Sequence, residues 1–66
     1  MPRIAYSEED RERIRTELIT VGLELMAQQG MQRTTVQQIY ERVGISRTFF
    51  YSFFPTKEDL IVEALY

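Results

Sequence analysis

The 66-residue sequence predicts an all-α fold: a three-helix helix-turn-helix domain followed by the start of a fourth helix. Two patterns favour this class, namely apolar residues at helical spacing and helix-capping residues that recur along the chain. The composition adds a third observation, because the chain contains neither cysteine nor histidine. Disulfides and the usual zinc ligands therefore cannot stabilise so small a domain, and a packed apolar core must do so.

The first helix is expected over residues 7–29, after a flexible arm at residues 1–6. Ser7 is a preferred N-cap residue, and the three acidic residues that follow it oppose the positive end of the helix dipole. Six residues fall on one helical face and predict its buried side: Ile14, Leu18, Val21, Gly22, Leu25 and Met26. Gly30 ends the helix, where it can adopt the left-handed conformation.

The second helix is expected over residues 35–42. Either Thr34 or Thr35 is its N-cap residue, because both hydroxyls precede the first apolar position. A glutamine three residues further on, Gln37 or Gln38, completes a capping box. The inner face of this helix is expected to consist of Val36, Ile39, Tyr40 and Val43.

The third helix is expected over residues 46–53, very soon after Gly44 stops the second. Ser46 is its N-cap residue. Ile45 before the cap and Phe50 inside the helix form a hydrophobic staple, which fixes the angle at which the chain enters the helix. Two short helices joined by a glycine-containing turn are typical of a helix-turn-helix unit.

Pro55 separates the third helix from a fourth, expected over residues 57–66, because the residue before a proline avoids helical geometry. Thr56 is the N-cap residue of the fourth helix, and Asp59 is its capping partner. The apolar residues of this helix are Leu60, Ile61, Ala64 and Leu65. No C-capping residue follows, so we expect the natural chain to continue beyond Tyr66.

The charge is unevenly distributed along the chain. The net charge is −2, yet residues 32–57 carry four basic residues and one acidic residue, Glu41, and acidic segments flank them. The four basic residues are Arg33, Arg42, Arg47 and Lys57. This basic segment coincides with the predicted helix-turn-helix, and that coincidence favours a nucleic-acid partner more than the net charge does.

Five of the six residues from Phe49 to Phe54 are aromatic. Helical spacing places Phe50, Phe53 and Phe54 on one side, where we expect them in the core. Tyr51 lies on the shoulder of that side and is either a packed ring or a phosphate donor. Phe49 falls outside the main apolar arc. It either packs against a neighbouring loop or the missing remainder of the chain, or contacts a thymine methyl group.

The composition argues against several classes of protein. Without histidine or cysteine the chain lacks the usual general base and the usual thiol nucleophile, so we expect no enzyme, no metal and no cofactor. No signal peptide is present, and no apolar run approaches the roughly 18 residues that span a membrane. We therefore expect a cytoplasmic, soluble protein.

An ordered set of short motifs, from about residue 10 to residue 65, resembles the N-terminal DNA-binding domain of the TetR family of bacterial transcriptional regulators. The motifs are Gly30-Met31, Thr34-Thr35-Val36, Ile39-Tyr40, Gly44-Ile45-Ser46, Phe50-Tyr51 through Phe54, and Thr56-Lys57-Glu58-Asp59-Leu60. Two positions depart from the family pattern. Tyr40 replaces a usual alanine at the contact between the two motif helices, so either the interhelix angle differs or the ring lies outward. Phe49 replaces a small residue that approaches a phosphate.

The resemblance implies a sequence-specific DNA-binding domain of a transcriptional regulator, expected to be a repressor, whose third helix lies in the major groove of double-stranded DNA. Such proteins act as dimers through a larger C-terminal helical domain, which also holds an effector pocket, so a palindromic operator is expected. That ligand-binding and dimerisation domain is expected to be absent from these 66 residues. A small-molecule effector would act only through it, and the fragment itself is expected to be monomeric or weakly associating.

Candidate DNA contacts divide into base contacts and phosphate contacts. The candidate base contacts are Gln37, Arg47, Thr48 and Ser52, since arginine can hold guanine in two places and glutamine can do the same for adenine. The candidate phosphate contacts are Thr35, Tyr51 and Lys57. Thr35 and Tyr51 match family positions with this role, and Lys57 lies near a helix N-terminus, where backbone N–H groups add positive potential. Arg3 in the N-terminal arm is a candidate for the minor groove.

A second class of function is also compatible with the sequence. The aromatic cluster at residues 49–54 could instead form the docking surface of a helical protein–protein interaction module. The acidic flanks and modest net charge suit that alternative.

Overall fold

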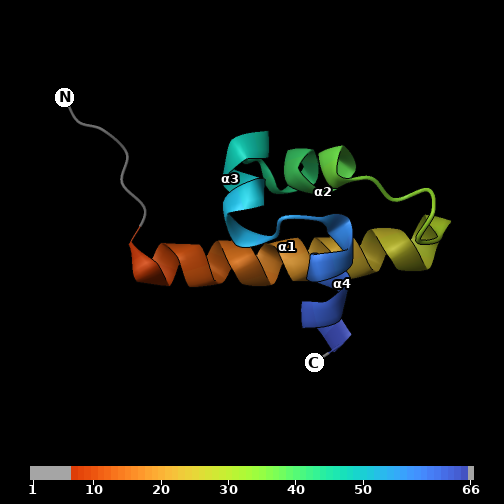
Figure 1. Ribbon diagram of the computed structural model, residues 1–66, viewed down its shortest axis with the longest axis horizontal. Coiled ribbons are helices and arrows are strands. Elements are labelled where there is room, and N and C mark those ends of the chain that lie inside the picture. Colours follow the sequence, from red (N-terminus) through yellow and green to blue (C-terminus); the bar gives the residue numbers. More distant parts are fainter. Residues whose placement is uncertain (1–6, 66) are drawn as a thin grey trace.

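The computed structural model describes residues 7–65, and these residues form four helices and no strand (Figure 1). The helices are α1 (Glu8–Gln29), α2 (Val36–Val43), α3 (Arg47–Phe53) and α4 (Lys57–Leu65). The predicted all-α class is therefore confirmed. The expected arm at residues 1–6, with Arg3, and the expected helix end at residue 66 lie outside the described residues.

The long helix α1 is the element against which the others are arranged (Figure 1). It packs against α2 and against α4, while α3 packs against α2. Helices α2 and α3 lie together on one side of α1, and the C-terminal part of α4 leads away from the opposite side (Figure 1). This arrangement leaves the outer faces of α2 and α3 open to solvent.

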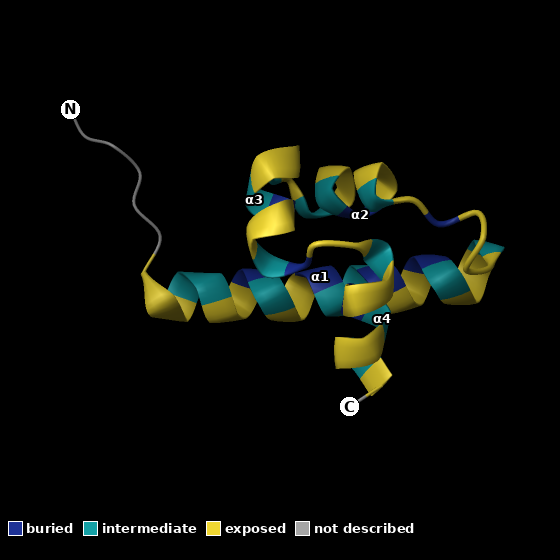
Figure 2. Ribbon diagram, in the orientation of Figure 1, coloured by how far each residue is buried: buried dark blue, intermediate teal, exposed yellow. Residues whose placement is uncertain are grey.

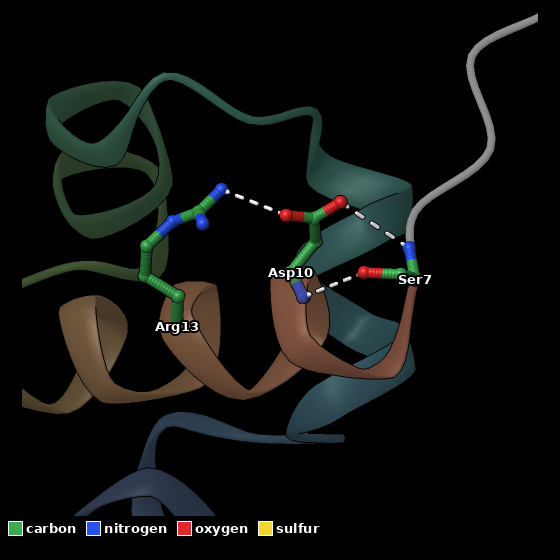
Figure 3. Close-up of polar contacts among 3 residues, drawn as sticks. All are labelled: Ser7, Asp10 and Arg13. Atoms are coloured by element: carbon green, nitrogen blue, oxygen red, sulfur yellow. Dashed lines mark hydrogen bonds and ion pairs between the residues drawn. The ribbon is translucent and has the colours of Figure 1, made fainter.

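The N-terminus of α1 is held by a capping box with an added ion pair (Figure 3). The Asp10 backbone N–H donates to the Ser7 hydroxyl over 3.1 Å, and the Ser7 backbone N–H donates to Asp10 Oδ2 over 3.3 Å. Arg13 Nη2 lies 3.1 Å from Asp10 Oδ1. The Asp10 carboxylate therefore satisfies a backbone donor at the helix end and a neighbouring cation together.

The C-terminus of α1 differs in detail from the expectation. The Gly30 backbone N–H donates to the Met26 carbonyl, and Gly30 has φ of 89°, so the helix does end at a glycine with positive φ. Its ψ is 156°, however, so Gly30 is not in the left-handed helical region, and the prediction of that conformation is wrong. An extended ψ directs the chain away from the axis of α1 and into the connection to α2.

The two threonines before α2 have different roles. Thr35 is the N-cap residue: the Gln38 backbone N–H donates to its hydroxyl over 3.1 Å, and Gln38 Oε1 accepts from the Thr35 N–H. Thr34 is fully buried, and its hydroxyl donates to the Gly30 carbonyl over 2.9 Å. One threonine thus begins the helix while the other closes the preceding turn.

The turn between α2 and α3 is only three residues long. Gly44 has φ of 95° and ψ of 29°, a left-handed conformation that glycine adopts at little cost, and its N–H donates to the Tyr40 carbonyl. The Ile45 N–H donates to the same carbonyl, and the Ile45 side chain packs against the core. The Ser46 hydroxyl then accepts from the Phe49 N–H and begins α3. This turn determines how α3 is placed against α2.

The core lies between α1 and the three shorter helices (Figure 2). Its buried apolar residues are Ile14, Leu18, Leu25, Ile39, Phe50, Phe54 and Leu60. Phe50 and Phe54 were predicted in the core, but the prediction for Phe53 is wrong, since this residue is only half-buried. Its ring packs against the edge of the core and also faces a cation, since the Arg11 guanidinium carbon lies 4.4 Å from the ring centroid.

Gly22 lies on α1 where the Leu60 side chain of α4 packs closely against it. A Cβ atom added at this position would lie 2.9 Å from Leu60 Cδ2 and 3.7 Å from Ile39 Cδ1. Leu60 and Ile39 are both fully buried, so neither side chain has free space into which it can move. The absence of a side chain at residue 22 therefore lets the two helices pack closely.

We expect Gly22→Val to lower the free energy of unfolding by about 1–3 kcal/mol, because the new methyl groups overpack a closed core. Urea unfolding followed by circular dichroism measures this change. Ala27→Val, on an exposed face of α1, is the matched control for placing a β-branched residue in the helix. An equal loss in both variants would show that packing against Leu60 is not the cause.

We expect the N-terminus of α1 to lose stability in acid. Hydrogen bonds from the Ser7 backbone N–H and the Ser7 hydroxyl, with the Arg13 cation, hold the pKa of Asp10 below its ordinary value of 3.8. A lowered folded-state pKa means that the contribution is present above pH 3.8 and is lost as the pH falls through the lowered value. Protection of the first-turn amides from hydrogen exchange, measured relative to the intrinsic exchange rate at each pH, should therefore fall in acid. Asp10→Asn should remove that dependence, and an unchanged pH profile in this variant would contradict the assignment.

Candidate nucleic-acid interface

A shallow depression of about 330 Å³ lies between the N-terminal half of α2 and helix α3. Its lining residues are Thr35, Val36, Gln37, Tyr40, Arg47 and Tyr51. Four of these were predicted as DNA contacts from the sequence: Thr35, Gln37, Arg47 and Tyr51. The short turn at Gly44 brings them together, because it folds the start of α3 back beside α2.

Thr35 and Gln37 are positioned by hydrogen bonds within α2. The Thr35 hydroxyl accepts the Gln38 N–H, and a hydroxyl that accepts one hydrogen bond still has its own proton to donate. The Gln37 amide nitrogen donates to Glu41 Oε2 over 3.0 Å, one turn further along the helix. Both side chains are exposed, so each is accessible to a ligand over α2.

Arg47 and Tyr51 form a pair one turn apart on α3. The Arg47 guanidinium carbon lies 5.8 Å from the centroid of the Tyr51 ring, within the range of a cation–π contact. The Tyr51 ring in turn meets the ring of Phe50 edge-on, with centroids 5.5 Å apart and planes at 90°. Phe50 is fully buried, whereas Tyr51 is 40% exposed. A core ring therefore supports an exposed ring, which supports the cation above it.

Thr48 and Ser52 are exposed on α3 but do not line the depression. The Ser52 hydroxyl donates to the Phe49 carbonyl over 2.6 Å. Its proton is therefore engaged by the helix backbone, and its oxygen is left to accept hydrogen bonds from a partner. These two residues extend the exposed polar surface of α3 next to Arg47.

Lys57 is the first residue of α4, as the sequence indicated, but its ammonium group makes contacts that the sequence did not indicate. Its Nζ donates to the Met31 carbonyl and to the Thr34 carbonyl, each over 2.9 Å. Two of its three ammonium protons therefore bind the turn that leads into α2. No sequence signal could have indicated this, because both acceptors are backbone carbonyls more than 20 residues away.

The structure also assigns positions to two residues that had no predicted contact role. Tyr40 is half-buried and lines the depression, with its ring tilted against Phe50 at 6.4 Å between centroids. Arg11 of α1 lies 5.7 Å from the ring centroid of Phe49 as well as over Phe53. For Tyr40, the sequence did contain a signal, namely its departure from the family pattern at this position. Nothing in the sequence indicated the contacts of Arg11, because they depend on how α1 lies relative to α3.

The aromatic segment does not form an exposed docking surface. Phe50 and Phe54 are buried, and Phe49 and Phe53 are half-buried and pack against the core. Tyr51 is its one large exposed ring. The expected alternative of a protein-interaction module that uses these rings for docking therefore has no support in the structure.

Across residues 7–65, no group of three or more acidic side chains is arranged to hold a metal ion. None of the four helices described is both long enough and apolar enough to cross a membrane.

Comparison with known proteins identifies the family. Residues 18–64 match the model of the bacterial regulatory proteins of the tetR family. The chain belongs to this family. The matched segment is the N-terminal, DNA-binding domain of a TetR-type regulator, and the family comprises regulators of transcription and not enzymes.

A curated relative points the same way. The TetR-family chain is 42% identical over 48 residues to an uncharacterized HTH-type transcriptional regulator, YuxN, of Bacillus subtilis (strain 168). The match covers 73% of this chain and 16% of the relative, so the chain spans only a small part of that protein's length. No solved structure matches the chain significantly.

We expect Lys57→Met to lower the free energy of unfolding by about 1–2 kcal/mol, because it removes two charge-assisted hydrogen bonds and keeps the apolar stem. Amide exchange at residues 31–35 should accelerate more than exchange in α1. Arg33→Met removes an exposed charge from the same turn and is the matched control. If exchange at residues 31–35 were unchanged in the Lys57 variant, the ammonium group would not hold this turn.

Proposed function

We propose that this TetR-family domain binds duplex DNA in a sequence-specific manner, with α3 in the major groove. One observation carries the proposal: Thr35, Gln37, Arg47 and Tyr51, from two helices, line a single open depression. An α-helix fits the width of the major groove, and α3 presents a polar and basic face beside that depression. Buried rings on its opposite side hold it against the rest of the domain.

Base reading is assigned to Gln37, Arg47, Thr48 and Ser52. Arg47 can donate two hydrogen bonds to the O6 and N7 atoms of guanine, and Gln37 can pair with adenine through its amide. Ser52 is suited to accept from an exocyclic amine of cytosine or adenine, because its own proton is bound to the Phe49 carbonyl. Thr48 is exposed next to Arg47 and has a hydroxyl and a methyl group to offer.

Phosphate binding is assigned to Thr35, Tyr51 and Lys57. The Thr35 hydroxyl retains its proton, and Tyr51 is exposed at the edge of the depression. Lys57 has a third ammonium proton beyond the two that bind the 31–34 turn. Its positive charge lies near the N-terminus of α2, where it adds to the potential of the helix dipole.

The features of a complete regulator follow from the family and are part of the same proposal. We expect the domain to act in a dimeric protein in the cytoplasm, as a repressor at a palindromic operator. A small-molecule effector would act through a C-terminal domain. A two-fold dimer would place two α3 helices on successive major-groove faces, so that operator symmetry mirrors protein symmetry.

We expect Arg47→Ala to change the sequences that the chain selects from a pool of random duplexes, and to weaken binding to the preferred duplex by about 1–3 kcal/mol. Arg42→Ala is the matched control, because Arg42 lines a separate depression between α1 and α2 and carries the same charge. Selection followed by sequencing measures the preference. Unchanged selection with Arg47→Ala would refute the assigned base contact, and binding that does not weaken with rising salt would refute DNA binding as the function.

A further inference from the structure

Tyr40 lines the depression but has no role in the proposed function so far. It lies on α2 between the two helices of the helix-turn-helix unit, and its ring packs against the core beside Phe50. It also lines the depression together with Thr35, Gln37, Arg47 and Tyr51. The Tyr40 ring therefore forms part of the surface that those four side chains also line.

The hydroxyl of Tyr40 is not buried, and it has no hydrogen-bond partner within the part of the chain that the structure describes. It makes no hydrogen bond to any residue among 7–65. Within the same described part of the chain, no buried side-chain oxygen or nitrogen lacks a hydrogen-bond partner. The oxygen of Tyr40 is thus not buried, as expected for a tyrosine that packs its ring and leaves its polar end wet.

The chemistry around this hydroxyl matches an anionic acceptor. The polar groups that line the depression are three hydroxyls, one amide and one guanidinium, and each of these can donate a hydrogen bond. No carboxylate is among the lining residues. Glu41, which lies one turn from Gln37, accepts the Gln37 amide and does not line the depression.

We propose that Tyr40 is a further phosphate contact, whose hydroxyl donates to one backbone phosphate of duplex DNA seated over the depression beside Thr35 and Tyr51. The inference rests on the proposed docking of α3 in the major groove. In that position the α2–α3 edge faces the sugar–phosphate backbone, where hydroxyl donors position a protein without reading sequence. The two tyrosines and the threonine then surround one phosphate from both helices of the motif.

Tyr40→Phe tests this directly, because it removes the hydroxyl and keeps the ring against Phe50. We expect affinity for every duplex to fall by about 2- to 10-fold, with the thermal midpoint and the selected sequence unchanged. The slope of affinity against salt should stay the same, because the lost group is neutral and releases no counterion. Lys57→Met is the comparison, since loss of a cation should reduce that slope.

A neutral methylphosphonate in place of single phosphates identifies the contacted position. One substitution should weaken the wild-type chain and have a smaller effect on the Tyr40→Phe chain, because the hydrogen bond is already lost. Equal affinity of the two chains for unmodified DNA would overturn the inference and leave DNA binding intact. A loss that depends on base sequence would overturn it in favour of a base contact. Failure of the wild-type chain to bind any duplex would overturn the proposed function as well.

Discussion

Phe50 is fully buried at the centre of the molecule, and three aromatic rings are arranged around it. Tyr40 of α2 lies at 6.4 Å between centroids, Tyr51 at 5.5 Å and Phe54 at 6.0 Å. Two of these neighbours, Tyr40 and Tyr51, also line the depression between α2 and α3. The position of the polar surface is therefore set by the packing of one core ring, and a cavity at Phe50 would disturb stability and the interface together.

The short helices that carry the interface depend on their ends. Helix α2 has eight residues and α3 has seven, lengths at which an isolated helix is not stable in water. Hydroxyl caps at Thr35 and Ser46, with Gly44 between the helices, satisfy backbone groups that would otherwise be unpaired. Packing of α2 against α1, and of α3 against α2, supplies the remaining stability. Local hydrogen bonds thus fix where each helix begins, and tertiary contacts keep it folded.

Whether a feature could be predicted depends on how far apart in the sequence the interacting residues lie. The caps at Ser7, Thr35 and Ser46 join residues three apart, so the sequence alone indicates them. The contacts of Lys57 with backbone carbonyls and of Arg11 with Phe53 join distant segments, and no residue pattern encodes them. Periodicity predicted the side of α3 that faces the core, but it could not predict that a guanidinium covers part of that side.

The cap at Thr35 restricts which side chains can occupy that position over evolution. Aspartate, asparagine, serine and threonine all begin helices well, because each offers an oxygen to a backbone N–H. Under the proposed docking the same group must also donate to a phosphate, and an aspartate would instead repel it. Serine and asparagine keep both properties of threonine, because each side chain can accept from a backbone N–H and also donate to a phosphate. A protein with aspartate at this position would keep the helix cap and lose affinity for its DNA.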